Sequence, residues 1–164
     1  MTHQDFIKQV KDSIENQPIP PHYNPKEWKG KNFNCYLYAL RACMDFETPL
    51  RFWIAPGFIS RGENNDYRDT VACTLNYFKA DCEELGLQVS PSTLEEKTGE
   101  NEYKIAIYVN KGKDYHFVRQ DCNGKWSEKR GWYKSIEIRK KEDVIKNKDG
   151  YIFIGIYKVS KKTG

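Results

Sequence analysis

The stretch that decides the fold is Lys31-Asn32-Phe33-Asn34-Cys35-Tyr36-Leu37-Tyr38-Ala39-Leu40. A cysteine follows an asparagine at the start of an apolar run with helical spacing, which predicts a helix over Asn34–Met44. With Asn34 as the N-cap, Cys35 lies in the first turn, where free backbone N–H groups and the helix dipole favour a thiolate. Because the thiolate is the reactive form, Cys35 is a candidate nucleophile. The alternative is a small buried side chain, as most free cysteines are.

Length and composition predict one folded domain over residues 1–164, since 38% of the residues are hydrophobic. The five cysteines are odd in number and lack CxxC spacing, which disfavours a disulfide framework and a structural zinc site. No apolar run is long enough for a membrane span, and the N-terminus lacks the layout of a secretory signal. We therefore expect a reduced, cytoplasmic protein of a bacterial or host cell, with no membrane partner, metal or cofactor.

Positive charge is concentrated in the last quarter of the chain. From Lys125 to Gly164 there are twelve Lys or Arg residues against five Asp or Glu residues. A nucleic-acid surface is one interpretation of this excess. No nucleic-acid-binding motif accompanies it, so a solvated face is the preferred interpretation and nucleic acid is not an expected partner.

The periodicity of apolar residues changes from helical to alternating along the chain. Helices are predicted over Thr2–Asn16, Asn34–Met44 and Asp66–Leu85. Strands are predicted over Tyr103–Asn110, Asp114–Asp121, Trp132–Ile138 and Tyr151–Val159, with loops at His22–Gly30 and Thr48–Gly62 and a helical turn at Glu142–Asn147. This order predicts an α+β fold in which N-terminal helices pack on a C-terminal antiparallel sheet.

One histidine lies in a predicted strand. His3 is at the N-terminus and His22 is in a proline-rich connection, whereas His116 follows the first hairpin turn of the sheet. A cysteine at a helix start and a histidine on an adjacent strand are the pair that nucleophilic catalysis requires. The alternative is a strand histidine packed by its aromatic neighbours.

This arrangement resembles the papain-like cysteine peptidase and amidase superfamily, including its NlpC/P60 branch. The segment Asn34–Ala39 (NCYLYA) resembles the cysteine-bearing helix start of that superfamily. The hairpin DYHFVRQD at 114–121, followed by NGKWSEK at 123–129, is similar to uncharacterised bacterial and viral proteins that read DYHFYRQD and then WSHKPG. The strand YIFIGIY at 151–157 also matches that group. The resemblance implies a papain-like fold and a cysteine-dependent hydrolase.

A third residue must orient the histidine ring. In the NlpC/P60 branch a polar residue about a dozen positions later does this, which points to Glu128, although the similar proteins carry histidine there. Asp121 is the rival candidate, with turn capping as its alternative role. A two-residue turn would place Glu128 on the face opposite His116. A three-residue loop with Gly124 left-handed pairs Asp121 with Lys125, and Glu128 then shares the face of His116, which the catalytic function requires.

An oxyanion hole is expected around the backbone N–H of Cys35. Asn32 and Asn34 are the nearest side-chain donors, although Asn34 is equally explained as a helix cap. Tyr23 and Trp28 are candidates to line the cleft and equally candidates to fill the core.

Two functions of different class follow from these residues. The first is a peptidase or amidase, with deamidase and acyl transferase as variants, which uses a Cys-His-acid triad on a peptide or protein substrate. The alternative is an inactive papain-like scaffold, such as a phage or mobile-element protein, that binds or inhibits. Its contact surface would be the basic segment Lys125–Lys141, which suits an anionic ligand or a partner protein. Glu128 in place of the usual histidine favours this alternative.

Overall fold

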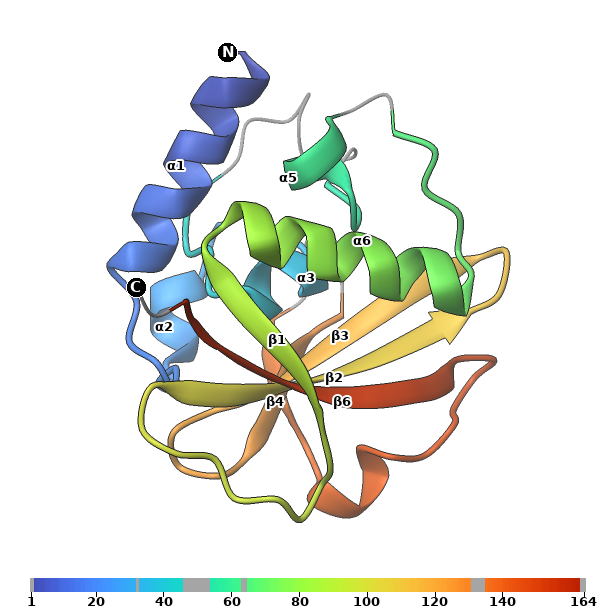
Figure 1. The fold of residues 1–164 in the computed structure, drawn as a ribbon. Helices are drawn as coiled ribbons and strands as arrows, with labels where there is room; N and C mark the ends of the chain where they lie inside the picture. Colours follow the sequence, from blue (N-terminus) through green and yellow to red (C-terminus); the bar gives the residue numbers. More distant parts are fainter. Residues whose placement is uncertain (1, 32, 46–53, 63–64, 131–134, 163–164) are drawn as a thin grey trace.

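The computed structural model describes residues 2–31, 33–45, 54–62, 65–130 and 135–162. Six antiparallel strands form one sheet in the order β1-β6-β2-β3-β4-β5. The strands are β1 (Leu87–Ser92), β2 (Glu102–Asn110), β3 (Asp114–Gln120), β4 (Trp126–Lys129), β5 (Ile136–Arg139) and β6 (Ile152–Lys161). The described helices are α1 (His3–Glu15), α2 (Pro25–Trp28), α3 (Cys35–Ala39), α5 (Phe58–Arg61), α6 (Val71–Glu84) and the 3₁₀ turn η1 (Lys141–Asp143). The predicted α+β class is confirmed (Figure 1).

The first helix begins at its predicted cap. Thr2 and Asp5 form a capping box, in which the Asp5 N–H donates to Thr2 Oγ1 at 3.1 Å and the Thr2 N–H donates to Asp5 Oδ2 at 3.2 Å. The third predicted helix begins at Val71 rather than Asp66, because the Thr70 side chain caps it by accepting from the Cys73 N–H at 3.1 Å.

The second predicted helix is shorter than its apolar pattern indicates. It ends at Ala39 instead of Met44, because Arg41 adopts a left-handed conformation with φ of 67°. The Ala42 N–H donates to the Leu37 carbonyl and the Arg41 N–H to the Tyr38 carbonyl, at 3.0 and 3.1 Å. These two bonds form a Schellman motif, which terminates the helix with arginine where glycine is usual.

Several connections differ from their predictions. The expected loop at 22–30 contains α2, and the described part of the loop at 48–62 contains α5, while residues 48–53 lie outside the described part. The helical turn expected at 142–147 is the 3₁₀ turn η1. The strand predicted over 132–138 is represented by β5, since residues 132–134 are not described.

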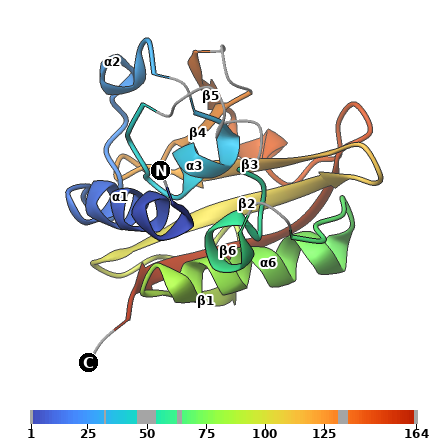
Figure 2. The ribbon, with the colours of Figure 1, turned by 90° about the horizontal axis from the view of Figure 1, so that it is seen from above.

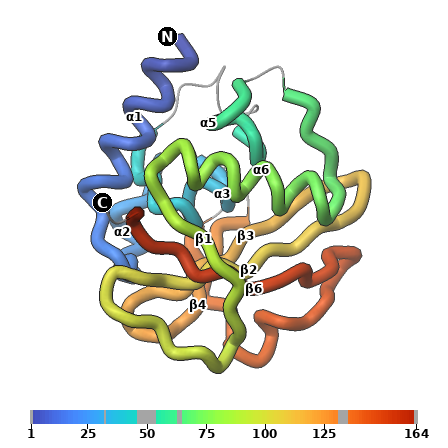
Figure 3. The backbone as a smooth tube through the Cα atoms, in the orientation of Figure 1, coloured from blue at the N-terminus to red at the C-terminus, as the bar shows by residue number. Residues whose placement is uncertain are grey.

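The antiparallel sheet is not a simple meander. Strands β2 to β5 follow one another as a meander, but β6 returns and pairs with β2 on its other side (Figure 3). Beyond β6 lies β1, which the sequence analysis missed because Pro91 disfavours a strand. Proline is tolerated there because β1 is an edge strand.

Alternate residues of β3 face two separate cores. Phe117 belongs to the core beneath α3 and α6, the two helices that lie over the same face of the sheet (Figure 2). Val118 belongs to a second, smaller core on the opposite face, together with Tyr108, Trp126 and Val144. Because side chains alternate along a strand, His116 lies on the face of the smaller core.

Candidate functional site

The hairpin that joins β3 to β4 has the register of a three-residue loop. The Asp121 N–H donates to the Lys125 carbonyl at 2.9 Å, and Gly124 is left-handed with φ of 83°. Glu128 therefore pairs with Val118, two residues after the histidine in β3. Residues directly opposite in a sheet share a face, so this register places Glu128 on the same side of the sheet as His116.

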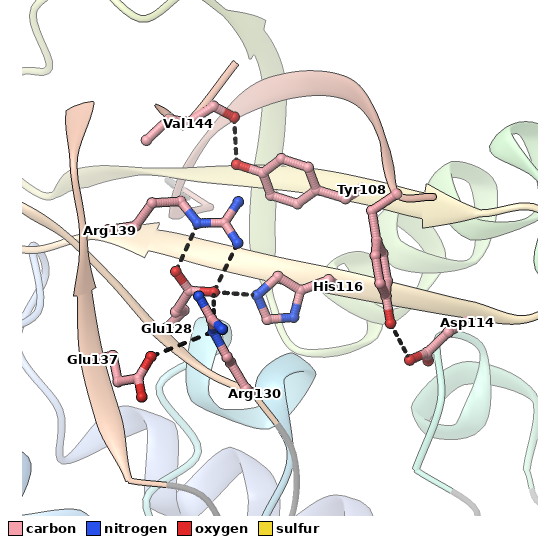
Figure 4. A network of polar contacts seen from close by, with 9 residues as sticks. Tyr108, Asp114, His116, Glu128, Arg130, Glu137, Arg139 and Val144 are labelled. Atoms are coloured by element: carbon pink, nitrogen blue, oxygen red, sulfur yellow. Dashed lines mark hydrogen bonds and ion pairs between the residues drawn. The ribbon is translucent and has the colours of Figure 1, made fainter. Parts of the chain in front are cut away.

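His116 and Glu128 form a close polar pair on this face (Figure 4). Nε2 of His116 lies 2.7 Å from Oε1 of Glu128, and their side chains are 13% and 1% exposed. The rings of Tyr108 and Tyr151 flank the imidazole at centroid distances of 5.9 and 6.2 Å. The other ring nitrogen, Nδ1, makes no hydrogen bond with the described residues. The pair fixes the ring and leaves one nitrogen for proton transfer.

Arg139 completes the environment of the Glu128 carboxylate. Its Nε and one terminal nitrogen donate to the two carboxylate oxygens at 2.6 and 2.9 Å. Burial by itself would raise the pKa of Glu128, but the hydrogen bonds and charges of His116 and Arg139 outweigh burial and lower that pKa from 4.5 to about 2. Glu128 is therefore ionised at neutral pH. The sequence analysis missed Arg139, because the predicted strand ended one residue before it.

Cys35 occupies the first turn of α3, as predicted, and Asn34 is the N-cap, accepting from the Leu37 N–H at 2.9 Å. The helix packs against β3 and β4. The backbone of Phe117, the residue that follows His116, lowers the pKa of the thiol. None of the hydrogen bonds among the described residues joins the Cys35 thiol to His116.

Burial controls the ionisation of Cys35. It raises the pKa of the thiol from 9.0 to about 12, while hydrogen bonds from the Phe117 and Tyr36 backbones lower it and the charges of Asp114 and Glu128 raise it. The predicted effect of the helix start is outweighed, because α3 has only five residues and the cysteine is 7% exposed. The resting state at neutral pH is a thiol.

Lys129 is a buried cation near the thiol. Its Nζ lies 4.8 Å from the centre of the Phe33 ring, and the residue is 2% exposed. Burial lowers the pKa of Lys129 from 10.5 to about 8, and the charge of Cys35 acts in the opposite direction. The alternation along β4 signals that Lys129 points away from Glu128, but nothing in the sequence indicates that it is buried.

Asp121 belongs to a different network. Oδ1 accepts from Arg119 Nε at 3.0 Å, and Oδ2 accepts from Ser127 Oγ at 2.6 Å. The described hydrogen bonds of Asp121 do not include one to His116. Between the two candidates for the third role, the structure brings only Glu128 to the histidine.

The predicted oxyanion donors are placed differently. The Asn34 amide nitrogen donates to the Ile54 carbonyl at 2.7 Å and to the Tyr115 hydroxyl at 3.3 Å. Since both the oxygen and the nitrogen of its side-chain amide form hydrogen bonds, Asn34 caps α3 and links it to Ile54 and Tyr115. Asn32 lies outside the described residues. The backbone N–H of Cys35 remains a predicted hydrogen-bond donor to the oxyanion.

The two aromatic candidates for the cleft differ in their burial. Trp28 is 4% exposed and packs against Phe33 and Tyr38 at centroid distances of 4.5 and 4.9 Å. Tyr23 is half-buried in the connection before α2. Trp28 is thus a core residue.

A cavity of about 170 Å³ opens beside the histidine. It is called the basic cavity here, and it is lined by Tyr108, His116, Glu128, Arg130, Arg139, Lys146, Lys148, Asp149 and Tyr151. Cys35 is not among these residues. Burial is the main cause of the raised pKa values of both Cys35 and Tyr151; beyond it, Glu128 raises the pKa of Cys35, and Cys35 raises that of Tyr151. The charges of Cys35 and of these residues therefore interact, although Cys35 belongs to the core beneath α3.

Two other kinds of feature are absent from the described residues. None of the described helices has the length and apolar character to cross a bilayer. Within the same residues, no three His, Cys, Asp or Glu side chains gather closely enough to hold a metal ion.

Comparison with known proteins places the chain in a family. No curated protein and no solved structure matches it. One family model matches, over residues 26–154, and this range contains Cys35, His116 and Glu128. The chain belongs to that family, which is described as Domain of unknown function (DUF7689).

Proposed function

We propose that the protein is a cysteine-dependent hydrolase with a papain-like arrangement, in which Cys35 is the nucleophile, His116 the base and acid, and Glu128 the orienting residue. The observation that carries the proposal is the 2.7 Å contact between His116 Nε2 and Glu128 Oε1, in the hairpin register that catalysis requires. The packing of α3, which begins at Cys35, against β3 and β4 supports it.

The reaction is acyl transfer through the thiol. His116 Nδ1 accepts the proton of Cys35 as sulfur bonds to the carbonyl carbon, and the tetrahedral oxyanion accepts a hydrogen bond from the Cys35 backbone N–H. His116 then donates that proton to the leaving amine as the carbon–nitrogen bond breaks. Water hydrolyses the thioester with His116 again as base, which releases the carboxylic acid and restores the thiol.

Burial of the thiol determines the step of the reaction at which Cys35 loses its proton and becomes a nucleophile. With a pKa of about 12, Cys35 does not form a resting ion pair with the histidine at neutral pH. Its proton therefore moves to His116 during the attack, and the ionised Glu128 stabilises the imidazolium that forms. The substrate class that this chemistry serves is a peptide or side-chain amide, with a peptidase, amidase, deamidase or acyl transferase as the enzyme type.

A binding or inhibitory scaffold is the second candidate function. The raised pKa of Cys35 and the bidentate hold of Arg139 on Glu128 favour it, because both reduce the reactivity of the triad. In this case the basic cavity would be the contact site for an anionic ligand or a partner protein.

Alkylation by iodoacetamide at neutral pH, followed by mass spectrometry of each cysteine, separates the two candidates. The enzyme predicts that Cys35 is modified faster than Cys82, which is equally a buried helix cysteine. It also predicts that this difference is lost in His116→Ala. The exposed Cys122 is the internal control, because its equal labelling in both proteins shows that both received the same amount of reagent. Equal, slow labelling of Cys35 and Cys82 in both proteins would contradict the hydrolase and support the scaffold.

A further inference from the structure

We infer that the basic cavity is a subsite for an anionic group of the substrate, a carboxylate or a phosphate, which binds beside His116 through Arg130, Lys146 and Lys148. This inference rests on the proposed function, because it assigns the anion to the molecule that Cys35 attacks.

The charges around the basic cavity do not cancel. Four Lys or Arg residues line it, against the two acids Glu128 and Asp149. Glu128 is engaged by His116 and by the bidentate Arg139, so its charge is neutralised within the wall. The exposed Asp149 is then the one acid of the lining left to balance the remaining cations. These are called the outer cations here: Arg130, Lys146 and Lys148.

The three outer cations are weakly held. Arg130 contacts Glu137 at 3.3 Å and Glu128 at 3.7 Å, and its side chain is 50% exposed. Lys146 contacts Asp143 at 3.3 Å as an exposed i,i+3 pair. Exposed pairs of this kind contribute little, so a ligand anion replaces them at small cost.

Lys148 is the most available of the three. It forms no ion pair within the part of the chain that the structure describes. It begins the turn Lys148–Tyr151, in which Asp149 and Gly150 are left-handed with φ of 53° and 87°. At Gly150 a Cβ would lie 3.1 Å from the Asn110 side chain, so the backbone of this turn packs closely against Asn110, and Lys148 lines the cavity.

The other side of the cavity is fixed and aromatic. The Tyr151 hydroxyl donates to Asp114 Oδ2 at 2.5 Å, and the Tyr108 hydroxyl donates to the Val144 carbonyl at 2.5 Å. The rings that flank His116 are therefore held in place before any ligand enters. A volume of about 170 Å³ admits one small acidic group rather than a nucleic-acid strand or a protein loop.

Calorimetric titration of the full chain at low ionic strength, with glutarate, inorganic phosphate and the neutral isostere glutaramide, tests the inference. We expect one of the two anions to bind and glutaramide not to bind. Binding by glutarate assigns a carboxylate, and binding by phosphate assigns a phosphate group. The double variant Lys146→Gln/Lys148→Gln should weaken this binding about tenfold or more, since two of the three outer charges are removed. The matched control is Lys8→Gln, which changes an exposed lysine of α1 outside the cavity and should bind as the natural protein does.

Absence of binding by both anions, or equal weakening in Lys8→Gln and in the double variant, would overturn the subsite. Alkylation of Cys35 distinguishes failure of the subsite from failure of the proposed function. If labelling of Cys35 still depends on His116 while no anion binds, the hydrolase is supported and the subsite is contradicted. If anions bind while labelling does not depend on His116, the hydrolase is contradicted, and so is the assignment of the anion to a substrate of Cys35.

Discussion

His116 Nε2 and Glu128 Oε1 lie 2.7 Å apart, although their residues belong to different strands and are 12 positions apart in the chain. The contact exists because the loop between β3 and β4 has three residues, which places both side chains on one face of the sheet. On the other side of Glu128, Arg139 occupies both carboxylate oxygens. Glu128 thus lies between His116 and Arg139, and both keep its carboxylate charged.

Replacing Glu128 with glutamine tests its charge. Glutamine retains a hydrogen-bond acceptor but loses the charge that stabilises an imidazolium, so the rate of Cys35 alkylation should fall about 100-fold or more. The rate is measured by mass spectrometry at neutral pH. Asp121→Asn is the contrast, since Asp121 binds Arg119 and Ser127 and should affect folding stability instead. A larger loss of labelling in Asp121→Asn than in Glu128→Gln would reverse the assignment.

The free energy of unfolding in acid should depend on the same pair, His116 and Glu128. The pKa of Glu128 is lowered from 4.5 to about 2, so the folded protein binds fewer protons than the unfolded chain between these values. The contribution of Glu128 is therefore complete above about pH 4.5 and is lost as the pH falls to about 2, at a cost of about 3 kcal/mol. Urea unfolding at a series of pH values measures this slope.

The control for the acid effect is Glu128→Gln. Because glutamine does not titrate, the difference in unfolding free energy between the natural protein and this variant should shrink as the pH falls through the same range. A difference that stays constant from pH 5 to pH 2 would show that Glu128 is not the titrating group.

Lys129 should control the reactivity of Cys35 through its charge. The ammonium lies over Phe33, two residues before the cysteine, and the charges of Lys129 and Cys35 interact. Lys129→Met should shift the pH profile of Cys35 alkylation to higher pH and slow labelling at neutral pH, whereas Lys129→Arg should retain the natural profile. Unfolding curves of both variants separate this effect from loss of folding.

An unchanged pH profile in Lys129→Met would contradict the role of its charge. The matched control is Lys125→Met, which removes an exposed charge at the opposite end of β4 and should leave the profile unchanged.

Local rules explain which elements the sequence predicts correctly. α1 follows from a capping box and one apolar face, and β2 and β3 follow from β-branched and aromatic residues. α3 was predicted too long, since helical periodicity continues past Arg41 and does not reveal its left-handed turn. The strand β1 was missed because a proline is acceptable only at a sheet edge, and edges are defined by pairing between distant segments.

By itself, the sequence determined the residue types of the candidate site and the elements that carry them: a capped cysteine at the start of α3 and a histidine on β3. It left two hairpin registers and two acids open, because both registers satisfy the local turn rules. Tertiary structure decided between them by pairing Val118 with Glu128. It also brought His116 and Arg139 to the carboxylate and buried the thiol, and these effects set the pKa values of Glu128 and Cys35 at about 2 and about 12. Such shifts depend on desolvation and on charges from distant segments, and neither exists until the chain has folded.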